Sequence, residues 1–399
     1  MSTDTGSGSD SAFEPIDWDE LGDGRFKLEW RTWGFLLALF ALGALFCYDY
    51  FTSYRLAVGA WYTPARLDWL FLLSLVVFVF VVVVPLLTDY ERTRRYWQRF
   101  RKNRLAVVCA AYLVLFFVLG ITSLLVLGRP STNIEYANQP ALFATIESGT
   151  VALNCAGDVT GPPTQQFCHG SLRFPFGTNS VGQSVLGLTI AGFGVSLLVA
   201  LVTSMIMIPI ATVVGVVAGY SGGWVDTILM RYVDVQQTVP AFVAYIILGF
   251  VFGQSLFLII LAFGLLSWGG VARLVRSEVI QRSDELYVTA AESAGANRTT
   301  AIRKHILPNI SSTVFTSTTR QIPLLILTEA AISFIVVLGD ENVPSWGQFI
   351  NSVTTEGGAV NVELWWVWVF PLVFLVITVF SFSVVGDALR DTLDPRGST

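Results

Sequence analysis

The chain contains repeated apolar runs of about twenty residues, separated by shorter polar segments. A helix rises about 1.5 Å per residue, so a run of this length crosses the ~30 Å hydrocarbon layer of a membrane. Only 13% of the 399 residues are charged, which is about half the share in a soluble domain. The runs are continuous rather than alternating, which argues against a transmembrane β-barrel. The sequence therefore predicts an all-α polytopic membrane protein.

We expect eight spans in this chain. The run from Val185 to Gly219 is long enough for one helix or for two short ones. Loops on the cytoplasmic side of a membrane carry an excess of Lys and Arg. Basic residues crowd positions 92–104 and 273–304, so both segments are expected in the cytoplasm, with an even number of spans between them. One helix at 185–219 meets this condition, and both termini then face the cytoplasm. The predicted spans are 33–51, 69–88, 104–127, 190–217, 228–252, 254–274, 311–338 and 365–386.

The ends of the chain and its largest loop differ from the spans in composition. The first residues are acidic and rich in Gly and Ser, without the basic start and apolar core of a signal peptide. We expect a disordered cytoplasmic tail at 1–32, an additional transmembrane hairpin with a basic linker at 33–99, and a transmembrane domain at 100–399. A large outer loop is expected at 128–183.

Two cysteines, Cys155 and Cys168, share the outer loop. Thiols outside the cytoplasm can be oxidised, so a disulfide that closes this loop is one expectation. Two unpaired thiols are the alternative, and the residues alone do not decide between them.

Residues of catalytic or metal chemistry are sparse. The chain has two histidines, His169 and His305, and lacks the glycine-rich phosphate loop, G-x-S-x-G and H-E-x-x-H. The spacing of the cysteines does not resemble a metal site. We therefore expect no enzyme, no metal site and no cofactor in this chain.

Charged residues inside predicted spans are costly in lipid and usually face a bundle interior or a cavity. Arg231 and Asp234 are three residues apart, close enough on one helical face to form an ion pair. Asp234, Gln237 and Glu329 are candidates to line a substrate path. The alternative is that they make contacts between helices or lie at the membrane ends.

The segment Ser283–Asn309 is a polar, charged stretch between two apolar runs. Ser283 can cap a short helix, Gly295 can end it with a positive φ, and Asn297 can cap a second helix. Pro308 suits the start of the next span. This pattern predicts a helix–Gly–helix elbow on the cytoplasmic surface. Docking of another protein and an amphipathic linker resting on lipid headgroups are both compatible with it.

The elbow resembles the coupling loop of ABC importer permeases, whose pattern is E-A-A, three residues, Gly, nine residues and I-x-L-P. The matching positions are Ala290, Ala291, Gly295, Leu307 and Pro308. Two residues depart from the general pattern. Thr289 stands in place of the leading Glu, and His305 stands in place of Ile, as it does in the dipeptide/oligopeptide/nickel subfamily.

The resemblance extends from about residue 100 to residue 396. The segments that are similar to the second permease subunit of that subfamily are FRKNRLAV (100–107), FPFGTNSVGQSV (174–185), GYSGGWVDTILMRYVDVQQTVP (219–240), EAAISF (329–334), PSWG (344–347) and GDALRDTLDPR (386–396). Asn179 and Gln183 replace an Asp and an Arg of the family pattern. The hairpin at 33–88 lies outside the resemblance.

The resemblance implies a six-span permease core with an extra hairpin, and a coupling loop at 277–309. The chain would be a permease subunit of an ATP-driven importer for peptides or related solutes. Its partners would be a homologous second permease, two cytoplasmic ATPases that bind ATP and Mg²⁺, and an extracytoplasmic solute-binding protein. A stand-alone secondary transporter or channel is the alternative function, and a structural membrane scaffold is a third.

Overall fold

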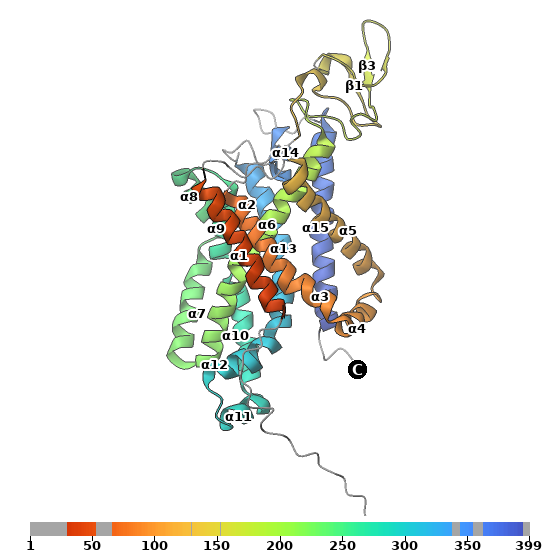
Figure 1. Ribbon diagram of the computed structural model, residues 1–399. Coiled ribbons are helices and arrows are strands. Elements are labelled where there is room, and N and C mark those ends of the chain that lie inside the picture. The colour runs from red at the N-terminus through yellow and green to blue at the C-terminus, as the bar shows by residue number, and fades with distance from the viewer. Residues whose placement is uncertain are drawn as a thin grey trace, which may run out of the picture.

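The computed structural model describes residues 30–52, 66–128, 130–151, 153–336, 344–353 and 362–393. Long helices run side by side, with a small β-sheet at one end and the short helices α11 and α12 at the other (Figure 1). The helices are α1 (Trp30–Phe51), α2 (Arg66–Phe78), α3 (Val84–Thr88), α4 (Tyr90–Phe100), α5 (Arg104–Thr122), α6 (Val185–Ser221), α7 (Gly223–Thr238), α8 (Ala241–Phe252), α9 (Leu256–Leu266), α10 (Gly269–Ser283), α11 (Leu286–Ser293), α12 (Arg298–Ala301), α13 (Leu307–Ile335), α14 (Trp346–Ser352) and α15 (Trp365–Leu393). The strands are β1 (Thr145–Glu147), β2 (Val159–Thr160) and β3 (Phe167–His169). Short helical segments η1 (Val79–Val83), η2 (Ser123–Leu127), η3 (Ile134–Tyr136), η4 (Ser148–Thr150) and η5 (Ile302–Ile306) join them.

Helices occupy all eight positions predicted for spans. Six helical stretches are long and apolar enough to cross a membrane by themselves. They are Trp30–Phe51, Leu67–Thr88, Arg104–Leu127, Val185–Ser221, Leu256–Ser283 and Trp365–Leu393. A seventh candidate, α7 with α8, is bent by 68° between Thr238 and Ala241. Proline disfavours a continuous helix, so Pro240 was a signal for this break that the predicted span 228–252 ignored. The remaining helix, α13, has 29 residues and a first half rich in Ser and Thr.

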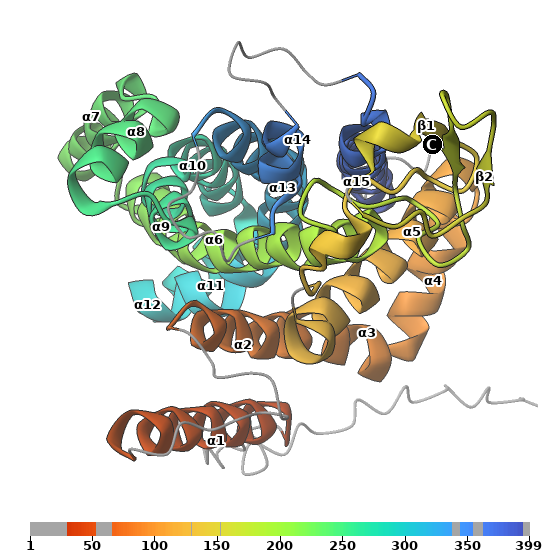
Figure 2. The ribbon, with the colours of Figure 1, turned by 90° about the horizontal axis from the view of Figure 1, so that it is seen from above.

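Helix α6 is the centre of the fold. It is one helix of 37 residues, as the distribution of basic residues predicts. The helix carries apolar side chains on all of its faces, which is typical of a buried helix. Figure 2 shows α6 passing between α2 on one side and α9, α10 and α13 on the other. The ring of Phe193 contacts the rings of Phe116, Trp346 and Phe374, so three further helices meet on α6.

The second half of α6 packs closely against α10 because two of its residues are glycines. A Cβ at Gly215 would lie 2.6 Å from the carbonyl oxygen of Ala272, and one at Gly219 would lie 2.8 Å from that of Arg276. Small residues four apart let two membrane helices approach at backbone distance. The main chains of α6 and α10 are therefore packed directly against each other.

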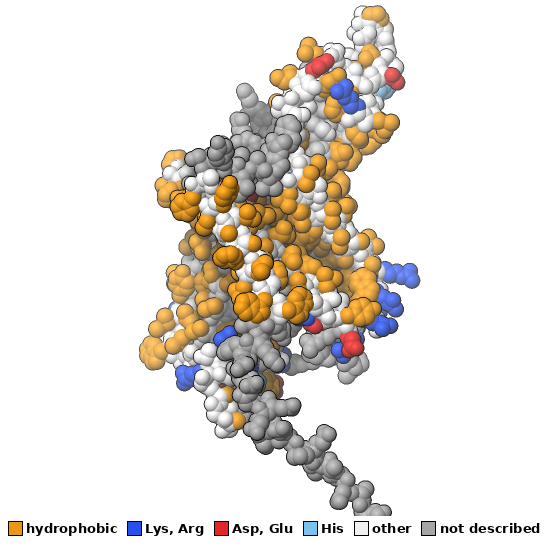
Figure 3. All heavy atoms as spheres, viewed as in Figure 1, with side chains coloured by type: hydrophobic (Ala, Val, Ile, Leu, Met, Phe, Trp, Pro, Cys, Tyr) orange, Lys and Arg blue, Asp and Glu red, His pale blue; other side chains and the backbone are white. Residues whose placement is uncertain are grey.

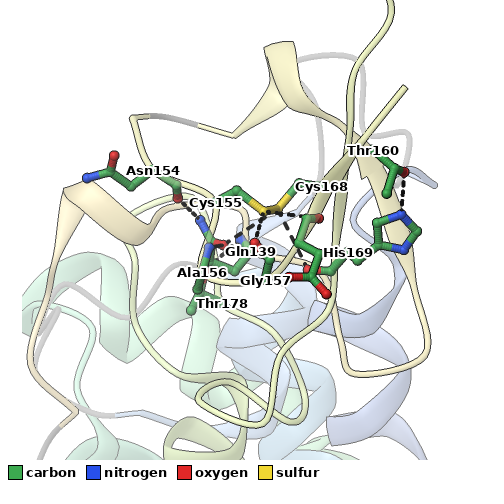
Figure 4. Close-up of a disulfide and its surroundings, with 10 residues drawn as sticks. Gln139, Asn154, Cys155, Ala156, Gly157, Thr160, Cys168, His169 and Thr178 are labelled. Carbon is green, nitrogen blue, oxygen red and sulfur yellow. Dashed lines mark hydrogen bonds between the residues drawn. A yellow bond between two sulfur atoms is a disulfide. The ribbon is translucent and has the colours of Figure 1, made fainter. Parts of the chain in front are cut away.

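Residues 130–184, which the sequence predicts to lie in the outer loop and which are called the outer region below, are held together around the buried side chain of Gln139 (Figure 4). The Gln139 amide nitrogen Nε2 donates to the Asn154 carbonyl at 2.6 Å, and its Oε1 accepts from the Ala156 N–H at 2.8 Å. The backbone N–H of Gln139 donates to Thr178 Oγ1 at 2.8 Å. Trp366 Nε1 in α15 donates to the Thr178 carbonyl at 3.1 Å. The first three bonds hold the outer region together, and the fourth attaches it to the start of α15.

A disulfide joins Cys155 and Cys168, whose Cα atoms are 5.8 Å apart. Cys168 lies in β3, the middle strand of the antiparallel order β1-β3-β2, so the bond ties the sheet to the loop before it.

We expect the double variant Cys155→Ser, Cys168→Ser to make the outer region more sensitive to protease. The bond closes a short loop, for which about 3 kcal/mol is typical. Mass spectrometry of unreduced peptides from the native membrane should find the two cysteines cross-linked, with the peptide that contains Cys47 as the control for a free thiol. Two unmodified thiols at 155 and 168 would contradict the bond.

The N-terminal helix α1 is the least integrated of the spans. It has no buried residue, and it packs beside α2, apart from the bundle (Figure 2). Arg31 at its start pairs with Asp89 at 2.9 Å. The predicted acidic tail at 1–32 falls almost entirely outside the described residues, so its disorder stays a prediction.

Candidate functional site

The predicted elbow forms as two short helical arms between α10 and α13. The first arm is α11, and the second comprises α12 and η5, which continues into α13. Gly295 has φ +93° and separates the arms, as expected. Asn297 caps the second arm by accepting from the Thr300 N–H at 2.8 Å. The predicted cap at Ser283 is wrong, because α10 continues through that residue and its hydroxyl donates to the Ile280 carbonyl.

The residues matched to the coupling pattern lie on the surface of the elbow or close below it. Thr289, Ala290, Gly295 and Pro308 are exposed, whereas Ala291, His305 and Leu307 are half-buried. A Cβ at Gly295 would meet no atom within 4 Å, so the positive φ and not crowding requires glycine there. Three side chains of the elbow are buried and anchor it to the rest of the chain: Val288, Ala301 and Ile306.

Contacts between the two arms give the elbow a defined shape. The ring of Tyr287 lies 6.2 Å from that of His305, and its hydroxyl accepts from Asn309 Nδ2 at 3.2 Å. Leu286, at the start of α11, is 86% exposed. An exposed apolar side chain beside small residues is suited to contact with another protein.

Two polar contacts, which the sequence patterns did not predict, join the elbow to the end of α6 and α10 to the start of α7. The Tyr220 hydroxyl donates to Glu292 Oε1 in α11 at 2.5 Å. Arg276 in α10 donates through Nε and Nη2 to the carboxylate of Asp226 in α7. Together with the glycine-mediated packing of α6 on α10, these contacts make α6, α7, α10 and the elbow one connected unit.

The polar residues predicted for a substrate path are not brought together. Asp234 lies 3.8 Å from Arg273 of α10, so the expected pair with Arg231 is wrong. Gln237 is exposed on the same helix. Glu329 is 1% exposed and accepts from Ser333 Oγ at 2.7 Å, inside the bundle. Asp234 and Gln237 therefore lie on an exposed face of α7 next to α10. The bond of Glu329 is to a residue of its own helix, α13, and the side chain does not reach the surface of this chain.

The two departures from the family pattern in the outer region contact each other. Asn179 Nδ2 donates to Gln183 Oε1 at 3.0 Å, and Asn179 Oδ1 accepts from the Gln183 N–H at 2.8 Å. A neutral amide pair thus occupies the positions where the pattern has opposite charges. Asn179 and Gln183 therefore make an uncharged polar contact at the turn before α6.

Within the described ranges, no three His, Cys, Asp or Glu side chains lie close enough to hold a metal ion. An open groove of about 980 Å³ is lined by Trp30, Arg31, Thr88, Asp89, Tyr90, Glu91 and Arg95. It lies where α1 meets α3 and α4, far along the chain from Asp234 and Gln237.

The geometry defines a multi-pass helical membrane protein with a structured elbow at one end and a disulfide-bonded region at the other. Two families match the chain: "Binding-protein-dependent transport system inner membrane component" at residues 211–398, and "N-terminal TM domain of oligopeptide transport permease C" at residues 91–141. The chain belongs to the family of binding-protein-dependent transport system inner membrane components.

Curated relatives agree with this assignment. The oligopeptide transport system permease protein OppC of Haemophilus influenzae is 36% identical over 55% of this chain and 70% of its own length. The oligopeptide permease protein of the same name from Bacillus subtilis is 30% identical over 75% and 88%. The dipeptide transport system permease protein DppC of Lactococcus lactis is 29% identical over 76% and 90%.

Proposed function

We propose that the chain is the permease subunit of an ATP-driven importer for peptides or related solutes. The observation that supports this most directly is the elbow: a shaped, exposed pair of short helices whose contacts lead to three spans. A stand-alone secondary transporter or channel would not need such a surface, because it has no ATPase to bind. The relatives that are named as peptide permeases favour the same class of substrate.

The coupling would work through the connected unit. A cytoplasmic ATPase would hold the elbow in a groove, and closure of two ATPases on ATP would displace it. Because α10 leads into α11 and its main chain packs directly on α6, displacement of the elbow would carry α6 and α7 with it. The break before α8 is a place where the moving part can rotate, as in rigid-body switching between inward- and outward-facing states.

The partners follow from this role. We propose a homologous second permease, two ATPases that bind ATP and Mg²⁺, and an extracytoplasmic solute-binding protein that meets the disulfide-bonded end. No cofactor would bind this chain, and both termini would face the cytoplasm. Asp234 and Gln237, on the exposed face of α7, would line the substrate path between the two permeases.

Purification of the tagged chain from its native membrane in mild detergent tests the proposal. We expect an ATPase with a G-x-x-x-x-G-K-[ST] motif to co-elute. Leu286→Asp should reduce the recovered ATPase at least tenfold, because it places a charge in the contact. Leu172→Asp is the matched control, since Leu172 is 80% exposed but lies in the outer region. Elution of the wild-type chain without any ATPase would contradict the proposal.

A further inference from the structure

Both ends of the basic helix α4 are joined by short connections to candidate membrane spans. A single residue, Asp89, separates it from α3, and three residues, 101–103, separate it from α5. The stretches before and after it, Leu67–Thr88 and Arg104–Leu127, are both apolar enough to span a membrane. Connections this short leave α4 no room to move away from the level at which those spans enter the bilayer.

One side of α4 carries aromatic rings. Phe100 is buried, and the ring of Trp97 stacks on it with centroids 5.9 Å apart. Trp97 is still 50% exposed, and Tyr96 is 43% exposed. Half-exposed Trp and Tyr side chains favour the boundary between the hydrocarbon and the headgroups.

The opposite side of α4 and the turn after it carry exposed cations. Arg94, Arg95 and Arg99 lie on the polar side of the helix, and Arg101 and Lys102 follow it. Figure 3 shows basic side chains gathered at the lower right, where α4 lies, beside the hydrophobic belt. In the described part of the chain, Arg94, Arg99, Arg101 and Lys102 form no ion pair.

Acidic groups near α4 do not neutralise these charges. Asp89 pairs with Arg31 of α1, and Glu91 lies with Arg95 in the groove at the start of the helix. In that groove two carboxylates face two guanidinium groups, so its charge is balanced. The excess of positive charge is on the outer side of α4 and on the turn before α5.

We propose that α4 is an interfacial helix that binds anionic phospholipid headgroups. A helix with aromatic residues on one side and Arg on the other lies in the plane of the interface, with the cations at the level of lipid phosphates. Basic clusters directly next to a span attract anionic lipid, and each cation contributes about fivefold to the attraction. Lipid is favoured over a protein ligand because the short connections keep the arginines at headgroup depth.

The test uses the full chain in nanodiscs that contain equal amounts of phosphatidylcholine and phosphatidylglycerol. After transfer to mild detergent, native mass spectrometry counts the lipids that each molecule retains. We expect wild-type protein to prefer phosphatidylglycerol and Arg94→Gln, Arg95→Gln, Arg99→Gln to lower that preference at least tenfold. Arg101, Lys102 and Arg104 are left in place in this variant, so that the orientation of the spans is retained.

Two control variants distinguish lipid binding from folding and from total charge. Replacing the same three arginines by Lys should preserve the preference for phosphatidylglycerol. Neutralising three exposed cations of the elbow, Arg298, Arg303 and Lys304, should also leave it unchanged. The proposal is overturned if wild-type protein retains both lipids equally, as it would if the arginines only directed insertion or were covered by the acidic residues 1–29. It is overturned as well if the elbow variant loses as much phosphatidylglycerol as the α4 variant.

Discussion

Gly295→Asp is expected to reduce substrate uptake at least tenfold while the chain still inserts and assembles. Gly295 is exposed, has φ +93°, and has open space around its Cα. In the proposed complex, a side chain at this corner between the two arms would change how the elbow sits in the ATPase groove, while Leu286 would still hold the ATPase in place. ATP hydrolysis by the complex should continue without driving uptake, and both rates can be measured in reconstituted vesicles.

The matched control for this experiment is Gly253→Asp. Gly253 has φ +87° and likewise no atom within 4 Å of an added Cβ, but it lies between α8 and α9. The two variants carry a similar cost of backbone strain, so only the elbow variant should lose coupling. Uptake at the wild-type rate in Gly295→Asp would remove the elbow from the coupling mechanism.

Gly215→Leu is expected to destabilise the chain strongly, by about 3 kcal/mol or more. The new side chain would meet the carbonyl oxygen of Ala272 and the side chain of Val275, and the main chain of α10 cannot yield as a flexible side chain can. Thermal unfolding of the purified chain in detergent should begin several degrees lower than in the wild type. Uptake should fall as well, because α6 and α10 would no longer move together.

Gly43→Leu is the matched control, because it makes the same substitution at a position of α1 with open space around the added side chain. An added Cβ at Gly43 in α1 would meet no atom within 4 Å, so the unfolding midpoint should not fall. Equal destabilisation by the two substitutions would show that loss of a glycine, rather than the contact between α6 and α10, causes the effect.

Much of the helical layout was predictable, because each span depends on local composition. A membrane requires about twenty apolar residues wherever it is crossed, and the excess of basic residues on one side decided that 185–219 is one helix. In the elbow, Gly295 and Asn297 took their predicted roles, since a positive φ and a side-chain cap involve only a few neighbouring residues.

Predictions failed where distant residues compete with local preference. Ser283 has the chemistry of a helix cap, but packing of α10 on α6 extends the helix through it. Asp234 has a basic neighbour one turn away, yet it lies beside Arg273 of another helix. Tyr220 and Glu292, which join the elbow to α6, are 72 residues apart, and neither carried a signal that pointed to the other.

The amino-acid sequence by itself determined where the long apolar helices lie and where the elbow bends, because those features arise from apolar length, charge and backbone freedom within short segments. Only the tertiary structure decided what the elbow is attached to, which polar residues remain exposed on α7, and that Arg94 and Arg99 of α4 form no ion pair in the described chain. These properties depend on contacts between helices that are far apart in sequence, and the geometry of such contacts is set by packing.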